Sequence, residues 1–218
     1  NGQIIIGGSF EQINGVGRTN FARLNPDGSL DTAFNPPFRY NFGIKALSLL
    51  PDSKILIGGT FGFGTFPPDT RDGLARLNAN GSVDLTFDAG RIQGFVEHLL
   101  PQPDGQVLIS GFFSSVRGIA RDGFARLSAN SGLDANFAPY FGGQGFHSPD
   151  SMALQPDGKI LIAGDFTTVN GSSRPGAARL HTNGAVDTTF NLTNAGPYFY
   201  TNGGSLSFVT VQTDGKII

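Results

Sequence analysis

The chain of 218 residues has no cysteine and no tryptophan, and only one methionine. The lack of cysteine excludes disulfides, thiolate metal sites and cysteine nucleophiles. No apolar run approaches the roughly 18 residues of a membrane-spanning helix, and no signal peptide pattern is present. The core must therefore be built from Leu, Ile, Val and the 20 Phe residues.

Charge is also scarce. The formal net charge is −2, and it is spread along the chain without a basic stripe or an acidic tail. The chain therefore lacks the basic patch that would bind nucleic acid phosphates, so nucleic acid is excluded as a partner. What is abundant is glycine, with 32 Gly and 13 Pro, a composition that favours a turn-rich, all-β fold.

One phrase recurs about every fifty residues along the chain. Ala-Arg-Leu is followed by a polar turn, then by Leu-Asp or Val-Asp, and then by a Phe three residues later. A period of this length is typical of stacked supersecondary units such as propeller blades. The copies are Ala22-Arg23-Leu24 to Phe34, Ala75-Arg76-Leu77 to Phe87, Ala125-Arg126-Leu127 to Phe137 and Ala178-Arg179-Leu180 to Phe190.

Each unit contains two hairpin signals. The first is an Asp-Gly type of turn followed by an apolar run, as at Asp157-Gly158 before Ile160-Leu161-Ile162. An uninterrupted apolar run indicates a strand buried on both faces. The second turns are predicted at Asp27-Gly28, Asn80-Gly81, Ser131-Gly132 and Asn183-Gly184.

Two hairpins make four strands, which is one propeller blade, whereas a β-solenoid coil is shorter. We therefore predict an all-β fold, a β-propeller built from four-stranded blades of about 52 residues. A single repeat region spans 1–218, with repeats at approximately 1–51, 52–103, 104–156 and 157–213 and the start of a fifth at 214–218.

The segment Gln155 to Gly171, with the Ala-Arg-Leu and the Gly-Ala-Val-Asp-Thr-Thr-Phe that follow it, resembles the delta-60 repeat family. That resemblance covers nearly the whole chain. It implies β-propeller repeats in a large bacterial protein, secreted or on the cell surface, without an assigned general activity. The chain is expected to be part of a longer one.

The number of blades is left open by the two ends. The first repeat lacks the strand before its Asn1-Gly2 turn, and Ser205 to Thr213 supplies one such strand. Leu206 to Val211 could close a four-bladed ring, but Lys216-Ile217-Ile218 would compete with Gln3-Ile4-Ile5 for the same place. We favour an arc of a larger propeller.

Each repeat also carries arginines and one aspartate at fixed positions. They could form a ring of anion sites, together with Arg18, Arg71, Arg121 and Arg174. Their recurrence in every unit favours a structural role that ties strand to strand or blade to blade. These structural pairs are Arg23 and Asp31, Arg76 and Asp84, Arg126 and Asp134, and Arg179 and Asp187.

No residue is predicted to be catalytic, and no cofactor or metal is expected. His98, His147 and His181 lie at different phases of the repeat, and a Ser and an Asp near His147 do not make a triad. Loops such as Asn25 to Asp31 resemble calcium loops faintly, but they lack the distal Glu and are interpreted as hairpin turns.

Aromatic residues gather in the segments that differ between repeats, where function concentrates on a rigid scaffold. Such rings can stack on sugars or anchor a protein, or they can simply cover the blade ends. The candidate binding residues are Phe38, Tyr40, Phe42, Phe63, Phe66, Tyr140, Phe141, Tyr198, Phe199 and Tyr200.

The leading hypothesis is a non-enzymatic binding module of a secreted or surface-attached bacterial protein, with protein or glycan as the partner. The first alternative is a purely structural repeat subunit of an extracellular assembly or fibre. The second is a propeller-type enzyme with a polar site at the axial channel.

Overall fold

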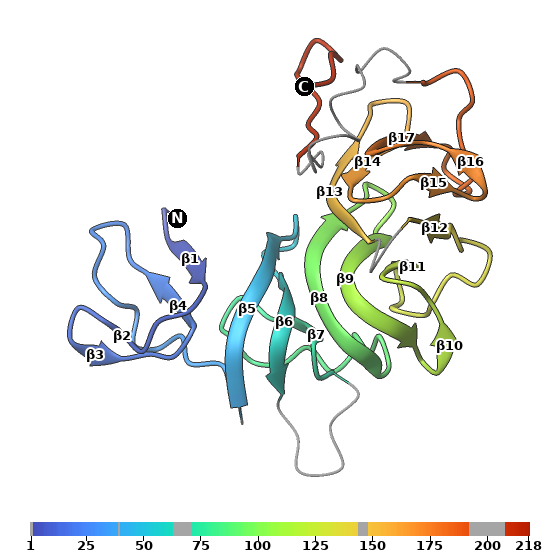
Figure 1. The fold of residues 1–218 in the computed structure, drawn as a ribbon. Coiled ribbons are helices and arrows are strands. Elements are labelled where there is room, and N and C mark those ends of the chain that lie inside the picture. The colour runs from blue at the N-terminus through green and yellow to red at the C-terminus, as the bar shows by residue number, and fades with distance from the viewer. Residues whose placement is uncertain (1, 39, 63–70, 144–147, 192–207) are drawn as a thin grey trace.

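The computed structural model describes residues 2–38, 40–62, 71–143, 148–191 and 208–218. The described residues form strands and turns and contain no helix, so none of them makes a helix that could cross a membrane. Small antiparallel sheets follow one another around an arc, from the N-terminal repeat at one end to the C-terminal segment at the other (Figure 1). The predicted all-β propeller arc is confirmed.

Three blades begin with their innermost strand and run outward as meanders. Blade 2 comprises β5 (Tyr40–Leu49), β6 (Ile55–Gly62) and β7 (Leu74–Leu77). Blade 3 comprises β8 (Ile92–Pro101), β9 (Val107–Val116) and β11 (Phe124–Leu127), and blade 4 comprises β13 (Pro149–Leu154), β14 (Ile160–Gly164) and β17 (Ala177–Leu180). The predicted fourth strand is reduced to a single bridge in each blade: Leu77 with Val83, Leu127 with Leu133 and Leu180 with Val186.

The first repeat has only the outer part of a blade. β1 (Ile4–Gly7) pairs with β4 (Phe21–Leu24), and Leu24 bridges to Leu30. No described strand lies on the other edge of β1, and Ile4 is 52% exposed. The predicted burial of both strand faces therefore holds for the runs beginning at Ile55, Val107 and Ile160 but not for the first run.

Short hairpins extend the blades beyond their central strands. They are β2 (Gln12–Ile13) with β3 (Val16–Gly17), the end of β9 with β10 (Ile119–Ala120), and β15 (Thr168–Val169) with β16 (Ser172–Ser173). β15 also pairs with β12 (Phe141–Gly142) on its other edge. Asn14-Gly15, Arg117-Gly118 and Asn170-Gly171 turn these hairpins with positive φ at both residues.

The C-terminal segment continues the arc and does not close it. Val209 packs against Leu161 and Ala163 of blade 4, and Val211 bridges to Ile217 as the next hairpin begins. This segment lies far from β1 around the arc (Figure 1). The closed ring considered above is therefore wrong for this structure, and the arc is confirmed.

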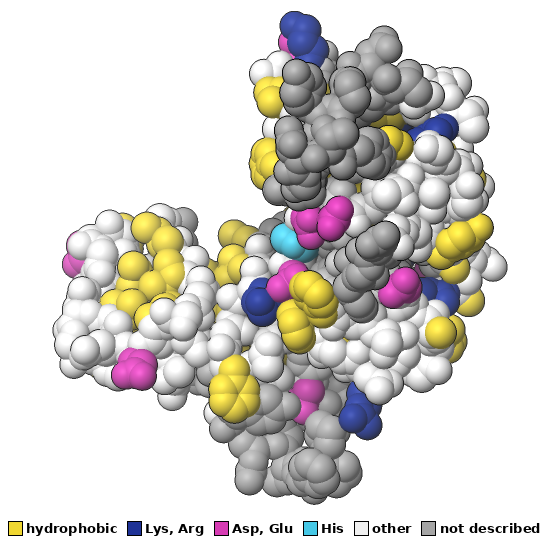
Figure 2. Space-filling model, viewed as in Figure 1, with side chains coloured by type: hydrophobic (Ala, Val, Ile, Leu, Met, Phe, Trp, Pro, Cys, Tyr) yellow, Lys and Arg dark blue, Asp and Glu magenta, His cyan; other side chains and the backbone are white. Residues whose placement is uncertain are grey.

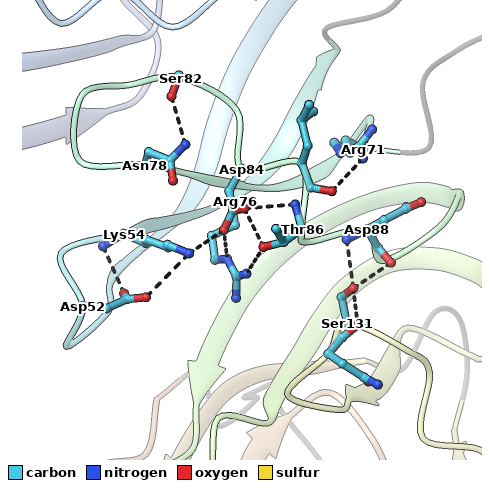
Figure 3. Close-up of polar contacts among 12 residues, drawn as sticks. Asp52, Lys54, Arg71, Arg76, Asn78, Ser82, Asp84, Thr86, Asp88 and Ser131 are labelled. Carbon is cyan, nitrogen blue, oxygen red and sulfur yellow. Dashed lines mark hydrogen bonds and ion pairs between the residues drawn. The ribbon is translucent and has the colours of Figure 1, made fainter.

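The second turn of the third repeat differs by one residue from the prediction. Ser131, and not Gly132, has a left-handed φ of 68° and takes the place held by Gly81 and Gly184. Those glycines lie against Phe34 and Phe137 of the preceding blade. Ser131 instead exchanges two hydrogen bonds with Asp88, accepting from its N–H at 2.8 Å and donating to its carbonyl at 2.9 Å (Figure 3). A serine hydroxyl thus replaces a ring contact between blades.

Neighbouring blades pack through one small residue at the end of each apolar run. A side chain on Gly7 would meet Ile44 at 2.8 Å, and one on Gly58 would meet Val96 at 2.9 Å. At the same position of the third repeat, Ser110 donates to the carbonyl of Pro149 at 2.7 Å. Each apolar run ends in a pair of small residues: Gly7-Gly8, Gly58-Gly59, Ser110-Gly111 and Ala163-Gly164. The close approach of sheets explains the first residue of each small pair.

Candidate functional site

The second residue of each small pair has a different cause. Gly59, Gly111 and Gly164 lie opposite irregularities in β5, β8 and β13. A Cβ atom on Gly111 would lie 2.6 Å from the Glu97 nitrogen, and one on Gly59 would lie 2.3 Å from the Gly43 oxygen. Each innermost strand therefore bulges where its neighbour has no side chain.

The residues left out of the strand pairing at these bulges are Lys45, Glu97 and Asp150. All three are charged, in strands whose flanking residues Ile44, Val96 and Pro149 are buried. β5, β8 and β13 adjoin in that order along the concave side of the arc (Figure 1). Three equivalent bulges thus bring charged residues to one surface, and bulges commonly re-aim side chains beside functional sites.

Aromatic side chains lie next to these charges. Lys45 Nζ is 2.9 Å from Glu97 Oε1 and 5.1 Å from the centre of the Phe95 ring. The Phe95 ring lies 5.5 Å from that of Phe112, directly across the β8–β9 pair. We call Lys45, Phe95, Glu97, His98, Phe112 and Asp150 the axial surface. Figure 2 shows basic, acidic, histidine and hydrophobic side chains gathered on this side of the arc.

A groove of about 440 Å³ runs along part of the axial surface, from Lys45 past His98 to Asp150 and Phe208. Partial removal from water raises the pKa of Asp150, as do the nearby charges of Asp165 and Glu97, while His98 acts in the opposite direction. A carboxyl group with a raised pKa, an imidazole and an ion pair can together donate and accept hydrogen bonds along the groove.

The aromatic residues predicted to bind a partner divide into three groups. Phe42 and Tyr140 are 76% and 57% exposed. Phe141 is 6% exposed and packs on Phe124 and Phe166, and half-buried Phe38 packs on Phe21 and Phe61. Phe38 and Phe141 therefore agree with the alternative that these rings cover the blade ends, because both pack against the core.

The third group cannot be placed. Phe63, Phe66, Tyr198, Phe199 and Tyr200 lie outside the described residues, as does the side chain of Tyr40 at the start of β5. Among the described aromatics, sequence reasoning missed Phe95 and Phe112. The signal that could have found the axial surface is the alignment of Lys45, Glu97 and Asp150, each of which follows a buried apolar residue at the same phase of the repeat.

The repeated arginines and aspartates form an ion pair in every repeat. The Nε atoms of Arg23, Arg76, Arg126 and Arg179 lie 2.7 to 3.0 Å from an oxygen of Asp31, Asp84, Asp134 and Asp187, respectively. The other arginines bond to main chain: Arg18 to Thr32, Arg71 to Leu85 and Arg121 to Asp134 and Ala135. These contacts, with that of Arg174 to the carbonyl of Ser173, lie within blades, as a structural role predicts, and the alternative of a ring of anion sites stays a prediction.

Histidines and turn residues complete the set of predicted sites. His98 belongs to the axial surface, His181 is part of a second turn, and His147 lies outside the described residues. In the loop that resembles a calcium site, Asp27 accepts hydrogen bonds from the N–H and hydroxyl of Ser29. That geometry is an Asx turn.

Comparison with known proteins supports the fold. No curated protein matches the chain. A crystal structure described as the extracellular domain of the one component system BT4673 from B. thetaiotaomicron superposes with a TM-score of 0.52 at 14% identity. The match covers 96% of this chain but 27% of that one, so this chain spans about a quarter of the solved structure.

A family model described as a domain of unknown function (DUF5122) beta-propeller matches four segments, residues 1–34, 50–87, 102–137 and 155–190. Each segment starts near a first turn and ends at the Phe that closes the repeated phrase. These segments make up more than half of the chain, and the chain therefore belongs to the DUF5122 beta-propeller family.

Proposed function

We propose that this propeller arc is a non-enzymatic binding module of a secreted or cell-surface bacterial protein, and that it binds a glycan at the axial surface. The observation that carries the proposal is the equivalence of the three bulges. A bulge costs regular pairing, yet β5, β8 and β13 each keep one, and each presents a charged side chain to the same concave surface.

The chemistry of the axial surface suits saccharides. Phe112 is 47% exposed and, with Phe95, offers ring faces on which the C–H side of a sugar can stack. Glu97 and Asp150 accept hydrogen bonds from hydroxyls, and Lys45 and His98 can donate them. Because the strands are paired on either side of each bulge, the backbone that carries these side chains is held in place before the ligand arrives, which reduces the entropy lost on binding. Exposed Phe42 and Tyr140 lie on the described surface as further candidate contacts.

The expected location rests on two likenesses. The superposed structure is an extracellular domain of a bacterial protein, although at 14% identity it shares only the fold. The second is the resemblance to delta-60 repeats, which implies a secreted or surface protein. The delta-60 assignment is more specific than the family match and stays a prediction.

An oligosaccharide microarray tests the proposal. Wild type is compared with Phe95→Ala/Phe112→Ala, with Glu97→Gln/Asp150→Asn and with the control Tyr140→Ala. We expect wild type to bind a defined set of glycans, and each axial double variant to lose at least about tenfold in affinity through lost stacking or charged hydrogen bonds. Binding that survives in both axial variants and is lost in Tyr140→Ala would place recognition on the loop instead.

A protein partner is the second candidate for the same surface. The Lys45–Glu97 pair and the exposed Phe112 ring also fit a protein contact. If no glycan binds and the axial variants abolish capture of a bacterial envelope protein, this candidate replaces the first. A purely structural role is the third candidate. It predicts concentration-dependent assembly that the axial variants leave unchanged.

A further inference from the structure

The arginine of the repeated phrase crosses to the next blade at two interfaces. Arg23 Nη1 donates to the carbonyl of Ala79 at 2.5 Å, and Arg126 Nη1 donates to the carbonyl of Thr182. Ala79 and Thr182 hold the same place in the second turn of the following repeat. The guanidinium therefore joins its own Asp to a neighbouring blade, and at the second of these interfaces the bonded Arg126 and Thr182 line a pocket of about 550 Å³.

The interface between blades 2 and 3 lacks this bond. Arg76 donates from Nε to Asp84 at 2.7 Å and from Nη2 to the Thr86 hydroxyl at 3.1 Å (Figure 3). Its Nη1 makes no hydrogen bond with any residue that the structure describes. Thr86 stands where the first and third repeats have Ala33 and Asn136, so the sequence supplies a hydroxyl acceptor within blade 2 that those repeats lack.

A slot of about 300 Å³ opens where the missing bond would be. Arg76 and Ala129 lie on its walls, and Ala129 is the residue equivalent to Ala79 and Thr182. The rest of the lining is mainly apolar, with Leu56, Phe87 and Val107 deeply buried. The slot thus combines a hydrophobic interior with one guanidinium N–H group that is not used.

The charges at the slot favour an acceptor that carries negative charge. Arg76 is the cation among the residues that line the slot, and behind it Asp84 is shared with Lys54, whose Nζ lies 2.9 Å from Asp84 and which does not line the slot. Asp52 lies at the slot too, but it is 3.9 Å from Lys54 and half exposed, where water screens its charge.

We infer that the slot between blades 2 and 3 binds a small carboxylate with an apolar body, such as an aryl or branched aliphatic acid. The carboxylate takes the place that the Ala79 and Thr182 carbonyls take at the other two interfaces and accepts from Arg76 Nη1. The apolar body packs on Phe87, Leu56 and Val107. This site is separate from the axial surface and does not depend on the function proposed there.

The test uses phenylacetate, with phenylacetamide as a neutral probe of the same shape, in titrations followed by protein NMR. For ten or so heavy atoms we expect a Kd of about 1 mM for phenylacetate. Phenylacetamide should bind about fivefold more weakly, because its hydrogen bond with Arg76 lacks the charge of a carboxylate. Equal affinity for the two probes, or no saturable binding of phenylacetate, overturns the proposal.

Three variants locate the site. Arg76→Lys removes the unused N–H group and should weaken phenylacetate binding about tenfold. Arg126→Lys is the matched control at an interface where Nη1 already donates to a carbonyl, and it should leave the affinity unchanged. Ala129→Phe adds a ring to an exposed wall residue and should block the slot without disturbing the core. If binding persists in folded Ala129→Phe protein, the ligand lies elsewhere and the proposal is wrong.

Discussion

Repeats 1 and 3 use the same arginine and aspartate differently from repeats 2 and 4. In repeats 2 and 4 the Asp is buried and has two further partners, a Lys from the first turn and the Thr two residues after the Asp. Lys54 and Thr86 contact Asp84, and Lys159 and Thr189 contact Asp187. In repeats 1 and 3 these partners are absent from the sequence, and the arginine reaches the next blade.

The difference teaches that an invariant pair does not have an invariant role. The Arg–Asp bond is present in all four repeats, but two neighbouring positions decide where the remaining N–H groups go. Lys and Thr occur together, as Gln and Ala or Asn do. The residues around the Arg–Asp pair therefore alternate between odd and even repeats, and at the interface between blades 2 and 3 the arginine stays within its own blade.

The largest effect should come from removing the arginine. Arg126→Ala should lower the free energy of unfolding by about 3 kcal/mol, because it leaves Asp134 without its guanidinium. Arg76→Ala should cost less, about 2 kcal/mol, because Lys54 and Thr86 remain on Asp84. Urea unfolding followed by circular dichroism measures both. Equal losses would mean that the additional partners contribute nothing.

Converting an even repeat into an odd one should have an intermediate effect. Lys54→Gln/Thr86→Ala gives repeat 2 the residues of repeat 1. It removes the Thr86 bond to Asp84 and replaces the charged Lys54 bond with a neutral one like that of Gln3 to Asp31, at a cost of about 1 to 2 kcal/mol. Arg76 Nη2 then lacks the Thr86 hydroxyl as an acceptor, and the guanidinium is free to reach the carbonyl of Ala129. A crystal structure of the double variant should show that bond, and an Arg76 that still points away from Ala129 would contradict the explanation.

Acid should distinguish the two kinds of repeat. Burial opposes ionisation of Asp84, but hydrogen bonds from Thr86, Lys54 and Arg76 outweigh it and hold its pKa far below the ordinary value of 3.8. A lowered pKa adds stability that is complete above about pH 4 and is lost as pH falls. Lys54→Gln should therefore raise the pKa of Asp84 and move acid unfolding to higher pH.

The matched control for this prediction is Lys216→Gln. Lys216 follows the same kind of turn but pairs with an exposed aspartate, Asp214, at 2.9 Å, and it is itself largely exposed. Its removal should leave the midpoint of acid unfolding in place. A shift of the same size in both variants would show that general charge, and not the cluster at Asp84, sets the acid response.

The smallest effect should come from making an odd repeat resemble an even one. Asn136→Thr places a hydroxyl two residues after Asp134, as in repeats 2 and 4. Because Lys is still absent there, we expect a change within about 0.5 kcal/mol, measured by thermal unfolding. A loss above about 1 kcal/mol would indicate that the hydroxyl alone pulls Arg126 from Thr182.

The repeated architecture could be predicted from the sequence because it rests on local signals. Turn residues such as Asp157-Gly158 and the apolar runs after them place the strands, and the period then indicates blades. The bulges could not be predicted in the same way. An extra residue such as Glu97 leaves no local mark in the sequence, and only the glycine on the paired strand, Gly111, permits it.

The aromatic residues show a second limit. Tyr140 and Phe141 are adjacent, yet one is exposed and the other completes the core. Which of two neighbours faces inward depends on the register of β12 against β15, which tertiary contacts determine. Composition alone marked both as surface candidates.

The most direct test of the central claim follows the arginine side chains in solution. Protein labelled with ¹⁵N-arginine, assigned with Arg→Lys variants, reports how fast each guanidinium N–H group exchanges with water. The account predicts slow exchange of Nη1 for Arg23 and Arg126, which are held between two blades, and fast exchange for Arg76. Equally slow exchange in all three would mean that every arginine bonds across its interface, and it would contradict both the alternation of repeats and the slot between blades 2 and 3.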